Sequence, residues 1–232
     1  MVLRGKAAVL REGVNEMQET LSIILKERLI LLSRGVPTEV LVQALTVCAD
    51  QGIALYESTF DHRLPDPISE NRDKLLALKK QLGSRIRFGA GTVLSAEEVH
   101  AAADAGAEFI VSPNSDEDVI RETKRLGLVS IPGAMTPTEI VCAWNMGADM
   151  VKLFPADDLG FHYIQNLMGP LPHVPLMATG GVNPVTIPQF IKAGIRAVGT
   201  GITIMRPDLV AKEDYEGIGI LAKMHVDALR LM

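Results

Sequence analysis

The sequence predicts a single (β/α)8 barrel that spans residues 1–232. Helical patterns alternate along the chain with short apolar runs of strand length. In most units a glycine separates the helical pattern from the next apolar run, and glycine just past a helix end is the common left-handed cap. The chain is long enough for about eight such units in one domain.

Residues 1–28 form an extension in front of the repeated units. Within it, the stretch 13–28, GVNEMQETLSIILKER, has a helical pattern, and we expect this extra helix to close the bottom of the barrel. The extension is charged and has no apolar segment of signal-peptide length. No apolar run in the sequence reaches the length of a membrane span.

Eight apolar runs supply the predicted strands. The first is RLILLSRG near position 30, the seventh is VPLMATGG, and the other six follow Gly52, Gly83, Gly106, Gly127, Gly147 and Gly194. Runs that are apolar throughout are typical of strands covered on both faces, as in a parallel sheet.

Helical patterns follow most of these runs. The clearest cover Pro37–Asp50, Ser95–Ala105, Ser115–Leu126, Thr136–Asn145 and Tyr215–Met232. Strands that alternate with helices form parallel sheets, and about eight units favour a closed barrel. An open, doubly wound sheet is less favoured, because no G-x-G-x-x-G motif opens the first unit.

Composition and charge exclude several classes of function. The net charge is −5 and basic residues form no cluster, which argues against a nucleic acid or a membrane as partner. Cys48 and Cys142 lack metal-ligand spacing, and two scattered thiols are typical of a reducing compartment, so we expect a cytoplasmic protein. The five histidines are also scattered, and the sequence predicts no metal site.

The phrase DMVKLFPA, residues 149–156, places one lysine inside an apolar strand. Alternation puts Lys152 and Phe154 on one face of this strand, and on the second strand Glu57 and Thr59 share a face. If both faces line the barrel, burial lowers the pKa of Lys152 and populates a nucleophilic amine beside a carboxyl that moves protons. A structural Lys–Glu pair, or a lysine that extends to the rim, is the alternative.

The expected carboxyl ends of other strands, where such barrels hold their active sites, carry further candidates. Arg34 and Thr92 either hold a substrate carboxylate together, or Arg34 pairs with an acid on the rim. Two turns after the seventh and eighth strands contain Gly180, Gly181, Gly199 and Gly201. These turns either bind phosphate through backbone N–H groups or serve turn geometry alone.

Eight phrases, in order, resemble the class I 2-keto-3-deoxy-6-phosphogluconate (KDPG) / 4-hydroxy-2-oxoglutarate (KHG) aldolases. They are YEST, GAGTVL, FIVSPN, IPGAMTPTE, VKLFPA, GPLP, ATGGVN and AVGTG, between about Leu29 and Met205. The resemblance implies a barrel that cleaves a 2-keto-3-deoxy sugar acid through a Schiff base. The expected products are pyruvate with glyceraldehyde 3-phosphate from KDPG, or with glyoxylate from KHG.

The resemblance also implies a role for each candidate residue. Lys152 forms the Schiff base, Glu57 is the general acid and base, Arg34 and Thr92 hold the carboxylate, Phe154 and Pro113 wall the pocket, and Gly180, Gly181, Gly199 and Gly201 belong to the phosphate corner. The implied enzyme uses no metal and no organic cofactor. It is a cytoplasmic homotrimer of carbohydrate metabolism, in the Entner–Doudoroff pathway, whose partner is a small 2-keto acid.

Two positions depart from the family pattern. Asp61 stands where many members carry an arginine, so Arg34 and Thr92 would hold the carboxylate without it. Gly201 or Ile202 stands where the family often has a serine in the phosphate turn. Two other functions stay open, a metal-dependent pyruvate aldolase and a non-catalytic barrel that binds a sugar acid.

Overall fold

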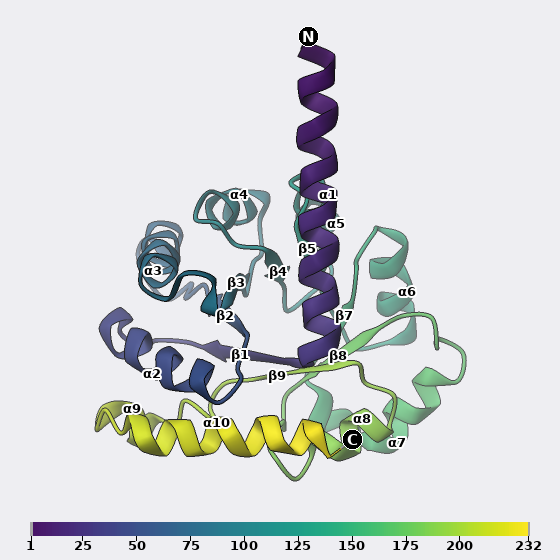
Figure 1. Cartoon of the computed structure of the whole chain (residues 1–232). Helices are drawn as coiled ribbons and strands as arrows, with labels where there is room; N and C mark the ends of the chain where they lie inside the picture. Colours follow the sequence, from purple (N-terminus) through teal and green to yellow (C-terminus); the bar gives the residue numbers. More distant parts are fainter. Residues whose placement is uncertain (1, 232) are drawn as a thin grey trace.

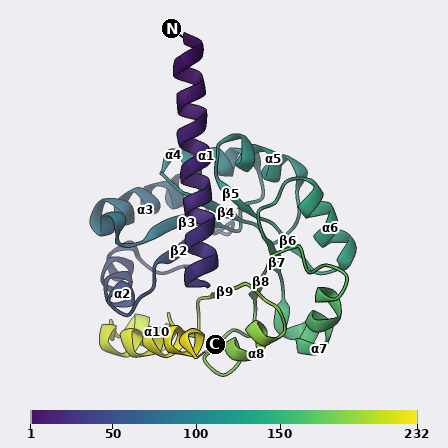
Figure 2. The ribbon, with the colours of Figure 1, turned by 45° about the vertical axis from the view of Figure 1, so that its right-hand side comes forward.

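The computed structural model describes residues 2–231, in which parallel strands form a nearly closed ring surrounded by helices (Figures 1 and 2). The strands are β1 (Leu29–Ser33), β2 (Leu55–Thr59), β3 (Arg87–Gly91), β4 (Phe109–Val111), β5 (Val129–Ile131), β6 (Gly133–Ala134), β7 (Val151–Leu153), β8 (Leu176–Thr179) and β9 (Ala197–Thr200). Their order is β5-β4-β3-β2-β1-β9-β8-β7-β6. The (β/α)8 fold expected from the sequence is confirmed.

Helices surround the ring, and all but the first of them lie on its outside (Figure 2). They are α1 (Val2–Glu27), α2 (Thr38–Asp50), α3 (Pro67–Leu82), α4 (Ala96–Asp104), α5 (Glu117–Arg125), α6 (Pro137–Asn145), α7 (Ala156–Met168), α8 (Ile187–Lys192), α9 (Pro207–Ala211) and α10 (Tyr215–Arg230), with a short 3-10 helix, η1 (Gly83–Arg85). The five helices delimited from the sequence agree with α2, α4, α5, α6 and α10 within two residues at each end. Side chains of Ser95, Asp116 and Thr136 cap three of them by accepting first-turn N–H groups.

The fifth predicted strand is divided into β5 and β6. Pro132 lies between them and has no N–H to donate, so the ladder is interrupted there. Its carbonyl still accepts the Lys152 N–H at 2.8 Å. Gly133 has no room for a side chain, because a Cβ atom there would overlap the Pro113 carbonyl. The chain therefore bends at this point while β5 pairs with β4 and β6 pairs with β7, which closes the ring.

The barrel interior is a packed apolar core with a few polar residues above it. Ile30, Leu55, Phe109, Val111, Val129, Ile131, Met150, Met177 and Ala197 fill it; all but Met150, which directly precedes β7, lie on strands, and none comes from β3 or β6. Alternate residues such as Tyr56 and Val151 point the other way and pack under the helices. Strand alternation thus decides which side chains reach the barrel axis.

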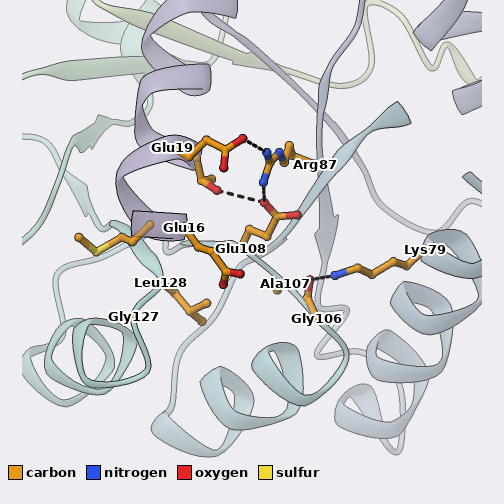
Figure 3. A pocket seen from close by; sticks show the side chains of 11 residues that line it. Glu16, Glu19, Lys79, Arg87, Gly106, Ala107, Glu108, Gly127 and Leu128 are labelled. Atoms are coloured by element: carbon orange, nitrogen blue, oxygen red, sulfur yellow. Dashed lines mark hydrogen bonds and ion pairs between the residues drawn. The ribbon is translucent and has the colours of Figure 1, made fainter. Parts of the chain in front are cut away.

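The last turns of α1 pack against the amino ends of the strands. Ile24 is fully buried among the interior residues, and Met17 and Leu21 pack beside it. Figure 3 shows the polar contacts at this end, where Arg87 pairs with both Glu19 and Glu108. Helix α1 is longer than the stretch 13–28 expected from the sequence, and its amino-terminal part extends away from the barrel (Figure 1). None of the helices described here has the length and apolar character needed to span a bilayer.

Candidate active site

Lys152 and Glu57 both lie inside the barrel. Each is the middle residue of its strand, β7 and β2, and they are 7% and 2% exposed. Met150 and Leu55, two residues before them, belong to the interior core. Because β2 and β7 lie on opposite sides of the ring, the two side chains extend toward the barrel axis from facing walls.

Burial shifts the charge states of both groups. Desolvation lowers the pKa of Lys152, which the charge of Glu57 opposes and the charge of Arg34 reinforces. Desolvation raises the pKa of Glu57, and Lys152, a hydrogen bond from Thr59 and Arg34 act against that rise. Both shifts favour the neutral forms, so a free amine and a protonated carboxyl become accessible nearer neutral pH.

The Glu57 carboxyl keeps one oxygen available. Its Oε1 accepts a long hydrogen bond of 3.5 Å from the Thr59 hydroxyl, and its buried Oε2 has no partner among the residues that the structure describes. Gly91 at the end of β3 makes room for this carboxyl, since a Cβ atom at position 91 would overlap it. The sequence analysis missed this role of Gly91, although the glycine lies in the GAGT phrase beside Thr92.

Arg34 and Thr92 meet at the mouth of the barrel. The Arg34 Nη2 donates a hydrogen bond of 2.9 Å to the Thr92 hydroxyl. Thr92 follows β3 directly and has a φ of 57°, a left-handed conformation that is unfavourable for a β-branched residue. Such strain is often retained where a backbone must present a functional group. The structure therefore brings together the two residues that the sequence proposed for a carboxylate.

Phe154 and Pro113 flank the lysine. The Lys152 Nζ lies 4.8 Å from the centroid of the Phe154 ring, which is 39% exposed. The half-buried Pro113 packs its carbonyl against Gly133, the residue of β6 that pairs with Lys152. Phe154 thus lies beside the amine, and Pro113 lies beside the strand that pairs with Lys152.

A cavity of about 370 Å³ adjoins Phe154 at the carboxyl ends of β8 and β9. We call it the distal pocket; it is lined by Leu32, Phe154, Thr179, Gly180, Gly181, Val182, Asn183, Gly199, Thr200, Gly201, Ile202 and Thr203. All four glycines proposed for a phosphate corner are among these residues. Gly180 and Gly181 have φ values of 101° and 65°, which explains why glycine occupies this turn.

Thr179 is a polar residue of the site that the sequence analysis passed over. Its buried hydroxyl has no hydrogen-bond partner within residues 2–231, and it lines the distal pocket. It lies two residues after Met177, whose side chain fills the barrel interior. The alternation used for Lys152 therefore identifies Thr179 as an interior hydroxyl as well.

Asp61, the departure from the family pattern, is engaged by a neighbour. Its carboxylate accepts hydrogen bonds of 2.7 and 2.6 Å from the Arg63 guanidinium, which holds the pKa of Asp61 far below its ordinary value. His62 bonds instead to the buried Glu98 at 2.7 Å. The negative charge of Asp61 is thus paired with Arg63.

Within residues 2–231, no group of three or more His, Cys, Asp or Glu side chains is arranged to hold a metal ion.

Comparison with known proteins gives consistent matches. A family model described as KDPG and KHG aldolase matches residues 26–221. The 2-dehydro-3-deoxy-6-phosphogalactonate aldolase of Escherichia coli (strain K12) is 30% identical over 203 residues, which cover 87% of this chain and 96% of that protein. A solved structure described as native KDPGal has a TM-score of 0.78 at 32% identity and covers 88% of this chain and 94% of its own.

A more distant match shares the fold. It is the KDPG aldolase from Legionella pneumophila, with pyruvate captured as a covalent carbinolamine intermediate. It has a TM-score of 0.75 at 24% identity, over 84% of this chain and 92% of that chain.

Proposed function

This chain belongs to the KDPG and KHG aldolase family, and on that premise we propose that Lys152 and Glu57 are its catalytic pair. The reaction is cleavage of a 2-keto-3-deoxy sugar acid to pyruvate and an aldehyde. One observation carries the assignment: Lys152 and Glu57 are both buried above the interior core, with both pKa values shifted toward the neutral forms.

The chemistry follows from these two groups. The Lys152 amine adds to the C2 ketone, and Glu57 protonates the hydroxyl that leaves as water, which produces an iminium. The Glu57 carboxylate then takes the proton from the C4 hydroxyl, the C3–C4 bond breaks, and its electron pair moves toward the iminium nitrogen. The resulting enamine is protonated at C3, and hydrolysis of the iminium releases pyruvate and restores the free amine.

The surrounding residues suggest how each end of the substrate is held. The Arg34 guanidinium and the Thr92 hydroxyl lie together and suit the carboxylate. The unpartnered Thr179 hydroxyl suits a hydroxyl of the sugar chain. The glycine turns of the distal pocket suit a phosphate group, which backbone N–H groups bind without a cationic side chain.

Names of the relatives support a phosphorylated substrate. A 2-dehydro-3-deoxy-6-phospho acid with gluconate or galactonate stereochemistry places its phosphate in the distal pocket while C2 lies at Lys152. KHG is the shorter alternative substrate. Because the iminium itself accepts the electron pair, we propose that no metal and no organic cofactor is needed. The homotrimer and the cytoplasmic location stay predictions.

Borohydride trapping tests the assignment. Reduction in the presence of pyruvate should attach a covalent adduct to Lys152, located by peptide mass spectrometry. Lys80 is an exposed lysine of α3 and supplies the matched control: Lys80→Ala retains trapping and turnover, whereas Lys152→Ala loses both. An adduct on another lysine contradicts the proposal. Absence of trapping, with turnover abolished by a chelator, favours a metal-dependent aldolase.

The role of Glu57 has its own test. Glu57→Gln keeps the shape of the side chain but cannot exchange a proton, so turnover should fall by about two to four orders of magnitude. Binding of pyruvate-derived inhibitors should change little. Full activity of a folded Glu57→Gln variant would exclude the carboxyl as the acid and base.

A further inference from the structure

Two threonines tie together the loops that form the distal pocket. Thr200 ends β9, and Thr203 lies in the turn after it; their hydroxyl oxygens are 2.6 Å apart. Both hydroxyls also lie 3.1 Å from the carbonyl oxygen of Val182. Val182 directly follows the Gly180–Gly181 turn after β8. The relative position of the two glycine turns therefore depends on this hydroxyl cluster.

A buried histidine supports the cluster from outside the pocket. His225 on α10 is 0% exposed, and its Nε2 lies 2.9 Å from the Thr203 hydroxyl. Its Nδ1 lies 2.7 Å from the carbonyl oxygen of Leu221, one turn earlier in the helix. Because a carbonyl only accepts, Nδ1 carries the proton, and in the neutral ring Nε2 accepts from Thr203. The single proton of the Thr203 hydroxyl then points to His225, so the Thr200 hydroxyl is the donor that lies between Thr203 and the Val182 carbonyl. Burial lowers the pKa of His225, which keeps the ring in this neutral form.

We propose that His225 is a positioning residue for the distal pocket, which it orders by accepting the Thr203 hydroxyl proton and so orienting the two glycine turns toward the phosphate end of the substrate. This inference rests on the proposed function, because it assumes that the pocket holds that end. His225 does not line the pocket, so it acts through Thr203.

The geometry separates this role from that of Lys152. The contacts of the cluster run from α10 to the loops after β8 and β9, and neither Lys152 nor Glu57 takes part in them. Lys152, to which pyruvate would be attached, and Glu57 do not line the distal pocket. Loss of the His225 contact should therefore weaken binding of the phosphorylated substrate and leave chemistry on pyruvate intact.

The experiment compares His225→Gln, His225→Phe and Thr203→Val with the wild type. Thr123→Val is the matched control, because the Thr123 hydroxyl is buried and bonds only within α5, to the Val119 carbonyl. The substrate is whichever 2-keto-3-deoxy-6-phospho acid the wild type cleaves fastest. The readouts are KM, kcat, borohydride trapping of pyruvate, and the ¹⁵N NMR signals of the His225 ring.

We expect KM to rise about five- to tenfold in Thr203→Val and His225→Phe, as for loss of one buried hydrogen bond, with kcat and pyruvate trapping within about twofold of wild type. His225→Gln, which keeps an acceptor, should recover part of the loss, and Thr123→Val should show none. The ring of the wild type should give the signals of a neutral Nδ1–H tautomer.

Three results would overturn the inference. The first is an unchanged KM in a folded Thr203→Val variant. The second is a rise in KM accompanied by an equal loss of pyruvate trapping. The third is an Nε2–H tautomer in the wild type. If His225→Phe does not fold, Thr203→Val decides alone, because valine matches threonine in shape. Failure of pyruvate trapping in the wild type would instead reject the proposed function itself.

Discussion

The polar groups beneath helix α1 are paired, whereas two groups beside the candidate active site are not. At the amino ends of the strands, polar groups are paired: Arg87 bonds Glu108 at 2.7 Å, and Thr20 donates to the same carboxylate at 3.0 Å (Figure 3). At the carboxyl ends, within the described residues, Lys152 forms no ion pair and the Thr179 hydroxyl has no partner. Unpaired buried groups cost stability, so their retention at one end indicates a function there.

Cavity size does not distinguish the two ends. The pocket beneath α1 in Figure 3 has about 330 Å³, close to the 370 Å³ of the distal pocket. Its cations, however, already have partners: Lys79 donates to the Gly106 carbonyl at 2.7 Å, and Arg87 bonds two glutamates. The two ends therefore differ in whether their cations have partners, and they do not differ much in cavity volume.

The sharpest test of this comparison exchanges a lysine at each end for methionine. Lys152→Met should lower kcat by at least about four orders of magnitude, because the nucleophile is gone. The fold should be at least as stable as wild type. Burial holds the pKa of Lys152 below its ordinary value, so at neutral pH the unfolded chain binds that proton more tightly, and the lysine disfavours folding.

Lys124→Met is its counterpart. Lys124 bonds both oxygens of Asp149 at 2.6 Å, and Asp149 also accepts the Ser130 N–H. Loss of the cation should lower the free energy of unfolding by about 1–3 kcal/mol and leave kcat within about threefold. Thermal unfolding and steady-state kinetics on Lys152→Met and Lys124→Met measure the stability and the kcat of each variant. Loss of kcat in Lys124→Met with unchanged stability would contradict a purely structural role for Lys124.

Two glycines of β3 allow a finer test on one strand. A Cβ atom at Gly91 overlaps the Glu57 carboxyl, whereas one at Gly89 overlaps the Phe109 ring in the apolar core. Gly91→Ala should reduce kcat by about a hundredfold, since the carboxyl must move. Gly89→Ala should mainly cost about 1–3 kcal/mol of stability through overpacking. Equal losses of kcat in folded Gly91→Ala and Gly89→Ala variants would show that the space beside Glu57 has no special importance for catalysis.

Thr179→Val has a smaller expected effect. The substitution removes an unpartnered buried hydroxyl, so the free energy of unfolding should stay the same or rise. The value of kcat/KM should fall by about tenfold if the hydroxyl bonds a substrate hydroxyl. Kinetics on KDPG and on its galactonate epimer, together with denaturant unfolding, check both parts. Lower stability with unchanged kinetics would mean that Thr179 is structural.

The pH dependence of borohydride trapping should reflect the lowered pKa of Lys152. Schiff-base formation needs the neutral amine, and burial holds the pKa of Lys152 below its ordinary value of 10.5. The trapping rate should therefore rise with pH and level off well below pH 10.5. A rate that keeps rising up to pH 10.5 would show that Lys152 behaves as a solvated lysine.

Local sequence patterns predicted a large part of this protein. The apolar runs identified the strands, the glycines after helical patterns marked where helices end, and strand alternation put Lys152 with Phe154, and Glu57 with Thr59, on one face of each strand. These features depend on neighbours within a few residues, where periodicity and turn preferences act. The fifth strand was expected to end at Pro132 and Gly133; the two-residue strand β6 after the proline was not predicted, because two residues are too few for a periodic pattern.

Contacts across the barrel were decided only by the tertiary structure. The fit of Gly91 around Glu57 and the contact between His225 and Thr203 involve groups whose approach depends on how the strands, loops and helices pack in three dimensions. The sequence by itself determined which side chains share a face of each strand, and the closed fold determined which face points to the axis. Ring closure determined which of them meet, because only then does burial remove water from Lys152 and shift its pKa.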